Sequence, residues 1–263
     1  MRLLFLSFYF PPDLSAGSFR AGTLVEELSE QLQSDDSVRV LTTQPNRYDT
    51  FDQEAPERER LANVSIARFP IPQHRSGQVD QGLSYGAYAS SVLQSIWNEE
   101  GQYDLVFATS ARLMTGVLGA VVARRMGAPL YLDLRDLFPL NLSELFAGKP
   151  QRIVVPFFRL LERWTLRRAS RVSVVSRGFV DHLRAIRDDL DYRVFTNGID
   201  EEFLDVDYRR ANPTSEGEKV ILYAGNVGDG QGLDRVVPDA AERLAPEFAF
   251  WIVGDGGRRE ELE

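Results

Sequence analysis

Short apolar runs alternate with amphipathic segments along most of this chain, and no other feature limits the possible folds as strongly. The first run, residues 3–8, is apolar at every position except Ser7. Runs of this kind are typical of strands that are buried on both faces of a parallel sheet. The same reasoning predicts further strands at residues 37–42, 64–69, 103–108, 130–134, 171–175 and 192–195.

Amphipathic segments separate these strands. Leu24, Val25, Leu28 and Leu32 recur at helical spacing within a predicted helix at 19–33. Further helices are predicted at 81–98, 114–126, 151–169 and 178–186. Residues 44–63 are charged, contain proline and have no period, so they are interpreted as a surface excursion. The alternation predicts a doubly wound, Rossmann-like α/β domain with a mostly parallel sheet over residues 1–196.

The pattern then restarts. Residues 197–218 are polar and contain Asn212-Pro213, which indicates a hinge or linker. Residues 219–263 form the first β-α-β unit of a second domain, with strands at 220–224 and 248–253, a helix at 233–244 and a charged helix start at 258–263. Two strands and one helix bury too little apolar surface to stand alone. We therefore expect this second Rossmann-like domain to be truncated, with about 100 or more residues missing at typical domain sizes.

Composition excludes several classes of site. The chain has no cysteine, which excludes disulfides and thiolate chemistry, and only two histidines, which leaves little for a histidine-based metal site or triad. A net charge of −9 argues against nucleic acid as a partner. No apolar run approaches the roughly 18–20 residues that cross a bilayer. The first run is better explained as a buried strand than as a signal peptide, so a cytoplasmic protein is expected.

Four loops follow predicted strands, and in open α/β sheets ligands bind where strands end. In the first loop, Gly17 and Ser18 precede the predicted helix start, where backbone N–H groups can approach an anion closely. A simple strand-to-helix turn is the alternative.

The second loop carries charge at the end of an apolar strand, in Asp133, Arg135 and Asp136. Such charge is costly unless it is paired or used. Function is one hypothesis, and an internal Arg–Asp pair that closes the strand is the other. Thr109 and Ser110, at the end of a neighbouring strand, either add hydroxyls to the same site or are turn residues.

The remaining two loops are rich in glycine. Gly225, Asn226, Gly228 and Gln231 lie between a strand and a helix, and residues 254–257 repeat the pattern after the next strand. Glycine allows a phosphate to meet bare backbone at a helix start. The spacing matches neither the dinucleotide fingerprint nor the Walker motif.

The segment 151–171 contains six arginines against one acid, Glu162, with apolar side chains between them. One interpretation is a core helix with a solvated arginine face. The other is a face that meets anionic lipid headgroups. The residues assigned to that face are Arg159, Arg163, Trp164, Arg167 and Arg168.

An ordered set of motifs resembles the glycosyltransferase family 4 enzymes of the GT-B fold. The motifs lie at residues 3–13 with 17–20, 133–139, 174–178, 197–200, 223–233 and 253–256, and so span essentially the whole chain. The most similar members are bacterial enzymes that build O-antigen (lipopolysaccharide), capsule or exopolysaccharide.

The resemblance implies an acceptor-binding N-terminal domain and a nucleotide-sugar-binding C-terminal domain. If the arginine-rich segment 151–171 meets lipid, the protein is expected to be a peripheral membrane enzyme at the inner face of the cytoplasmic membrane. The reaction would retain anomeric configuration, need no metal or other cofactor, and move a sugar from a donor, expected to be a UDP-sugar, to a glycan or polyprenyl-linked acceptor.

Roles follow from the resemblance position by position. Asp136 and Arg135 are expected to be catalytic, and Asp133, Thr109 and Ser110 to bind the acceptor. Donor contacts are expected from Gly17, Ser18, Arg20, Gly225, Asn226, Gly228, Gln231, Gly254 and Gly256.

Two departures from the family limit this transfer. Many relatives carry an arginine and a lysine near the positions of Asn226 and Gln231, so here the charge that neutralises the diphosphate must come from elsewhere, with Arg20 as the candidate. The family's pair of donor-binding glutamates is expected beyond residue 263, so residues 1–263 alone are predicted not to turn over a donor.

Two other functions remain open. A nucleotide-sugar 2-epimerase uses a related fold, although two histidines make it a poor match. A non-catalytic module that binds a nucleotide or sugar is the third possibility, and it would show binding without turnover.

Overall fold

The computed structural model describes residues 1–46, 54–72, 78–97, 99, 102–110, 113–137, 151–199, 201–204, 219–228 and 231–262. The chain divides into two compact units, Met1–Gly198 and Ile199–Glu263. Much of the segment predicted as a linker, residues 205–218, lies outside the described residues.

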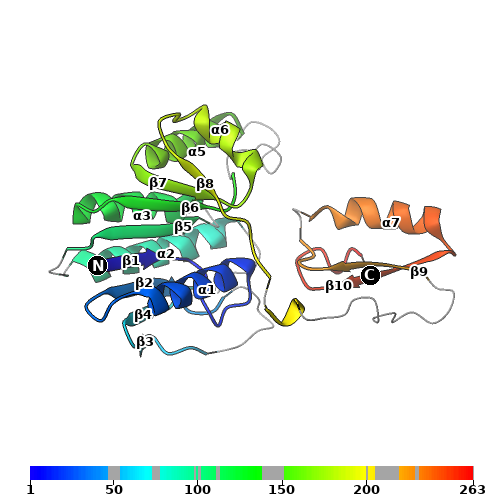
Figure 1. The fold of residues 1–263 in the computed structure, drawn as a ribbon. Helices are drawn as coiled ribbons and strands as arrows, with labels where there is room; N and C mark the ends of the chain where they lie inside the picture. Colours follow the sequence, from blue (N-terminus) through cyan, green and yellow to red (C-terminus); the bar gives the residue numbers. More distant parts are fainter. Residues whose placement is uncertain are drawn as a thin grey trace. The chain divides into compact units, whose positions relative to one another are not determined.

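The first unit is built on an eight-stranded sheet with the order β3-β4-β2-β1-β5-β6-β7-β8 (Figure 1). Every neighbouring pair is parallel except β3 and β4. The mostly parallel sheet predicted from the apolar runs is therefore confirmed. The strands are β1 (Arg2–Leu6), β2 (Ser37–Thr43), β3 (Arg58–Leu61), β4 (Val64–Phe69), β5 (Leu105–Ser110), β6 (Leu130–Leu134), β7 (Ala169–Val174) and β8 (Tyr192–Val194).

Helices pack against both faces of this sheet, which explains why its central strands are mainly apolar. Leu3 and Phe5 of β1 lie in a cluster with α1, whereas Leu4 and Leu6 point to the other face, where α2, α3, α5 and α6 contribute. The helices are α1 (Ala16–Gln31), α2 (Gln78–Trp97), α3 (Leu113–Met126), α5 (Gln151–Leu166) and α6 (Val180–Arg184).

Two features of this unit differ from the sequence predictions. The segment predicted as an irregular excursion contains β3, a charged edge strand that pairs only with β4 and so has no apolar pattern. Helix α1 begins at Ala16 rather than near residue 19, because the Ser15 side chain accepts a hydrogen bond from the Ser18 amide and caps the helix.

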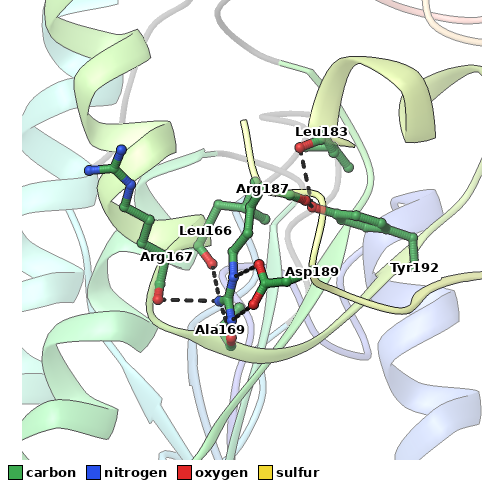
Figure 2. A network of polar contacts seen from close by, with 7 residues as sticks. All are labelled: Leu166, Arg167, Ala169, Leu183, Arg187, Asp189 and Tyr192. Carbon is green, nitrogen blue, oxygen red and sulfur yellow. Dashed lines mark hydrogen bonds and ion pairs between the residues drawn. The ribbon is translucent and has the colours of Figure 1, made fainter. Parts of the chain in front are cut away.

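The C-terminal end of α5 is closed by the side chain of Arg187 (Figure 2). Its Nη1 donates to the carbonyl oxygens of Leu166, Arg167 and Ala169 at 3.0, 3.2 and 2.7 Å. Its Nε and Nη2 bind the Asp189 carboxylate at 2.8 and 3.1 Å. A cation is favoured here because the last carbonyls of a helix lack intrahelical donors and carry partial negative charge. This contact ties α5 to the segment that precedes β8.

The second unit contains the parallel strands β9 (Lys219–Ala224) and β10 (Phe248–Val253), joined through α7 (Leu233–Leu244). These are the three elements that the sequence predicts. The helix predicted from residue 258 is wrong: the described residues up to 262 form turns. The Arg258 amide donates across to the Val227 carbonyl, and the Arg259 amide bonds three residues back to Gly256, so the helical ladder is not formed.

Candidate functional site

The carboxyl ends of the strands in the first unit form the candidate site. Strand β1 pairs with β2 on one side and with β5 on the other, so the direction in which strands are added reverses at β1. In open α/β sheets this switch point is where ligands bind. Helix α1 begins at the same edge, directly after β1.

A row of polar side chains crosses three strands near this edge. Thr109 of β5 is paired in register with Asp133 of β6, which is paired with Ser173 of β7. All three are buried. The Ser173 hydroxyl donates to Asp133 Oδ1 at 2.7 Å, and the Thr109 hydroxyl to Oδ2 at 3.4 Å. Their apolar neighbours Leu132 and Val172 belong to the cluster on the opposite face, so the row faces the α1 side of the sheet.

Arg20 of α1 holds the carboxylate at the centre of this row. Its Nε and Nη2 each lie 3.1 Å from an oxygen of Asp133, and its Nη1 donates to the Thr196 carbonyl at 3.2 Å. The side chains of Arg20 and Asp133 are 17% and 3% exposed. With the two hydroxyls, this bidentate pair occupies the acceptor capacity of the carboxylate. An Arg–Asp pair does close the strand, but the arginine comes from α1.

Arg135 follows Asp133 and lacks such compensation. Its backbone amide donates to the Ser110 carbonyl at 3.3 Å, while its side-chain Nε and Nη1 are buried without a hydrogen-bond partner among the described residues. Burial lowers the pKa of the Arg135 guanidinium; Asp133 opposes this change and Arg20 adds to it. A half-buried cation therefore lies beside an ion pair that is already neutral.

The other predicted residues of this edge differ in exposure. Asp136 is exposed to solvent directly after Arg135, whereas Ser110 is buried. Gly17 is half-buried and Ser18 fully buried, and both lie within the first turn of α1 rather than before it. The catalytic, donor and acceptor roles expected of these residues stay predictions.

In the second unit, the two glycine-rich loops pack against each other. The Val227 amide donates to the Asp255 carbonyl at 2.9 Å. A Cβ atom on Gly254 would lie 1.8 Å from the Gly225 carbonyl oxygen, and one on Gly256 would lie 2.2 Å from that of Val227. Both glycines are thus required by the close approach of two backbones, which is a reason separate from phosphate binding.

Side chains of the first glycine loop bind each other. The Asn226 side-chain amide donates to Gln231 Oε1 at 2.9 Å, and the Gly228 backbone amide donates to the same oxygen at 3.2 Å. The residues between them, 229 and 230, lie outside the described residues. The predicted diphosphate contacts of this loop stay predictions, and its described side chains between 225 and 231 carry no positive charge.

Helix α5 presents an apolar stripe with arginines along one side. Ile153, Phe157 and Leu160 are 77%, 55% and 64% exposed. The stripe is flanked by the exposed Arg152, Arg159, Arg163 and Arg167. Trp164 instead packs against the core, and the Arg168 guanidinium lies 3.9 Å from the centre of its ring. Within the described part of the chain, no helix is long and apolar enough to span a bilayer.

No candidate metal site is found in the part of the chain that the structure describes. There, no three histidine, aspartate or glutamate side chains gather where they could hold an ion. Independence from metal stays a prediction.

Sequence reasoning missed Ser173 and the main contact of Arg20. Ser173 lies in an ordinary alternating strand, and only the register of β6 against β7 brings it to Asp133. Arg20 was expected to neutralise a diphosphate, and in this structure it binds Asp133.

Comparison with known proteins gives a family match over most of the first unit. A family model described as "Glycosyl transferase 4-like domain" matches residues 21–198. The "Putative colanic acid biosynthesis glycosyl transferase WcaI" of Escherichia coli (strain K12) is 26% identical, with 100% of this chain and 68% of that protein covered. The 2-deoxystreptamine glucosyltransferase of Streptomyces kanamyceticus is also 26% identical, with 76% of this chain and 55% of that protein covered.

Solved structures show the same fold. Anabaena Alr3699/HepE in complex with UDP-glucose has a TM-score of 0.56 at 16% identity, covering 100% of this chain and 63% of that one. Its complex with UDP and glucose has a TM-score of 0.54 at 18% identity, covering 100% of this chain and 64% of that one. These similarities support the GT-B-like α/β fold that the sequence resemblance predicts. The chain spans roughly two thirds or less of the length of these structures.

Proposed function

Because the chain belongs to the glycosyl transferase 4-like domain family, we propose that the complete protein transfers a sugar from a nucleotide-diphosphate sugar to a glycan acceptor. The observation that carries this proposal is the family match over residues 21–198, which includes the polar row Thr109, Asp133 and Ser173. The name of the Escherichia coli relative supports a role in cell-surface polysaccharide synthesis. The UDP-glucose complex of the Anabaena protein supports a UDP-sugar as donor.

The proposed reaction retains the configuration of the sugar. The bond between the anomeric carbon and the diphosphate oxygen breaks, and a bond to the acceptor oxygen forms on the same face. The acceptor hydroxyl passes its proton to the departing diphosphate, which takes up the bonding electrons. The protein then has to orient the two substrates and stabilise the charge that develops on the leaving group.

The carboxyl edge of the first unit supplies groups for these tasks. Asp136, exposed at the end of β6, is the side chain that we expect to meet the sugar or the acceptor hydroxyl. The first turn of α1 offers backbone N–H groups to phosphate oxygens. No metal ion is required in this scheme.

The acceptor that fits the surface of the first unit best is a lipid-linked glycan. The stripe of Ile153, Phe157 and Leu160 exposes apolar area on α5, and the arginines beside it favour an anionic surface. We propose that this side of α5 lies on the cytoplasmic leaflet of the membrane, where a polyprenyl-linked acceptor is embedded. An attraction of about 1 kcal/mol per arginine near such a surface gives a measurable effect when three are neutralised.

Transfer is tested with the complete gene product. Purified protein is incubated with UDP-sugars and lipid-linked glycans, and products are followed by chromatography and NMR. Formation of a glycoside with the donor's anomeric configuration is expected. Interconversion of the UDP-sugar without an acceptor would point to an epimerase, and binding without turnover to a non-catalytic module; either result refutes the proposal.

Membrane binding is tested by sedimentation with vesicles that contain phosphatidylglycerol. We expect binding to fall strongly when three exposed arginines of α5 become glutamine, and also in the variant Phe157→Ser. A matched control neutralises three exposed arginines elsewhere in the first unit and should bind like the wild type. Equal losses in both triple variants would show only a general charge effect and would contradict the role of α5. The α5 set is Arg159, Arg163 and Arg167, and the control set is Arg58, Arg60 and Arg184.

A further inference from the structure

Arg135 places a cation at the carboxyl edge of the first unit, beside an ion pair. Arg20 and Asp133 form that pair through two hydrogen bonds, so together they are neutral. Asp133 attracts the Arg135 guanidinium and Arg20 opposes this attraction. The Asp133 carboxylate is already bound by Arg20, Ser173 and Thr109, so it does not serve as the hydrogen-bond partner of Arg135.

Two of the three guanidinium nitrogens of Arg135 have no protein partner in the described part of the chain. Nε and Nη1 of Arg135 are buried and donate to no partner among the described residues. Buried donors are nearly always hydrogen-bonded, and a charged donor left without a partner is especially costly. The energetic cost of these unpartnered donors is removed if a bound ligand accepts their hydrogen bonds, so the arrangement indicates a binding site.

We propose that Arg135 binds a phosphate group of a substrate, in place of the role expected of Arg20. A guanidinium matches the geometry of phosphate oxygens and can donate to two of them at once. Arg20, the cation expected to bind phosphate, is held by Asp133 instead. This inference rests on the proposed function, because that function brings phosphate-bearing substrates to this edge.

Two substrates of the proposed reaction carry phosphate: the diphosphate of the nucleotide sugar and the diphosphate of a lipid-linked acceptor. Both present the same chemistry to Arg135, and binding measurements separate them. The complete gene product is titrated with UDP and, separately, with farnesyl diphosphate as a short lipid diphosphate, and affinities are measured by calorimetry. The variants are Arg135→Gln and Arg135→Lys, and the exposed Arg58 on the opposite edge strand gives the matched control Arg58→Gln.

The expected result is a loss of about tenfold or more in affinity for at least one of the two probes in Arg135→Gln. Arg135→Lys should recover part of it, and Arg58→Gln should bind like the wild type. A loss confined to UDP assigns the donor, and a loss confined to farnesyl diphosphate assigns the acceptor. Unchanged affinity for both probes, or a wild type that binds neither, overturns the proposal.

Thermal unfolding supplies a readout that a structural role would not give. Without ligand, Arg135→Gln should unfold at the same temperature as the wild type or higher, because it removes a buried charge that has no partner. A clear fall in the unfolding temperature would show that Arg135 stabilises the fold and would overturn the inference. The binding measurement does not depend on catalysis. If the protein binds phosphate through Arg135 but transfers no sugar, the proposed function is refuted and the inference about Arg135 stands.

Discussion

The ion pair between Arg20 and Asp133 should respond unequally to removal of its two partners. In Asp133→Asn the carboxylate charge disappears, and the guanidinium groups of Arg20 and Arg135 remain close together without compensation. Breaking a largely buried pair in this way typically costs about 3–5 kcal/mol of unfolding free energy. In Arg20→Met the carboxylate keeps its two hydroxyl donors and the attraction of Arg135. That variant loses three charge-assisted hydrogen bonds, two to Asp133 and one to the Thr196 carbonyl, and about 2 kcal/mol is expected.

The assay is urea unfolding followed by tryptophan fluorescence. The chain has three tryptophans, of which Trp97 and Trp164 lie in the first unit and Trp251 in the second. In a Trp251→Phe background the signal therefore reports the first unit alone. Ser173→Ala is the control for the loss of one hydroxyl donor, with about 1 kcal/mol expected. If Arg20→Met proved as destabilising as Asp133→Asn, or more so, the argument that Arg135 is an uncompensated cation would fail.

Three further perturbations test other parts of the structure. Gly254→Ala places a Cβ against the Gly225 carbonyl and should destabilise the second unit by about 3 kcal/mol, measured by unfolding followed through Trp251 fluorescence. In the control Gly257→Ala the new Cβ meets no atom within 4 Å, so the change should be nearly neutral. Similar effects of the two substitutions would contradict the close packing of the two loops. Burial raises the pKa of Glu162, so the folded state favours the protonated carboxyl. As pH rises from 4.5 the wild type should therefore lose unfolding free energy relative to Glu162→Gln, measured by urea titration at each pH. A difference between the two proteins that does not change with pH would refute this. Arg187→Gln should cost about 2–4 kcal/mol in the same assay because three carbonyls lose their donor, and it should exceed the cost of removing the exposed carboxylate partner of Arg187.

Continuous apolar runs made the central sheet predictable. Strands such as β1 and β6 are covered on both faces, so nearly all of their side chains are apolar and the sequence alone indicates their burial. Edge strand β3 has no apolar pattern that would predict it, because three of its four side chains are charged and only its backbone pairing to β4 defines it. The start of α1 was misjudged since Ser15, rather than the first apolar residue, sets the boundary through its cap.

The candidate site was predictable only in outline. Charge at the end of an apolar strand pointed to Asp133 and Arg135, because such charge needs a partner or a use. Asp133 has partners because α1 positions Arg20 beside it and β7 positions Ser173 beside it. Both contacts join residues that are far apart in the sequence. Composition and spacing do not encode that register. The glycines of the second unit show the same limit, because one glycine pattern serves both phosphate binding and the packing of two loops.

The central position of β1 has a consequence for synthesis of the chain. Strand β1 precedes every other described strand in the chain, and its Leu3 pairs with Leu105 of β5 on one side. A nascent chain that has emerged only as far as β2 can protect one edge of β1 while the other edge waits for β5. Because long-range pairing of this kind is slow, strand β1 should need chaperone protection during translation until β5 has emerged.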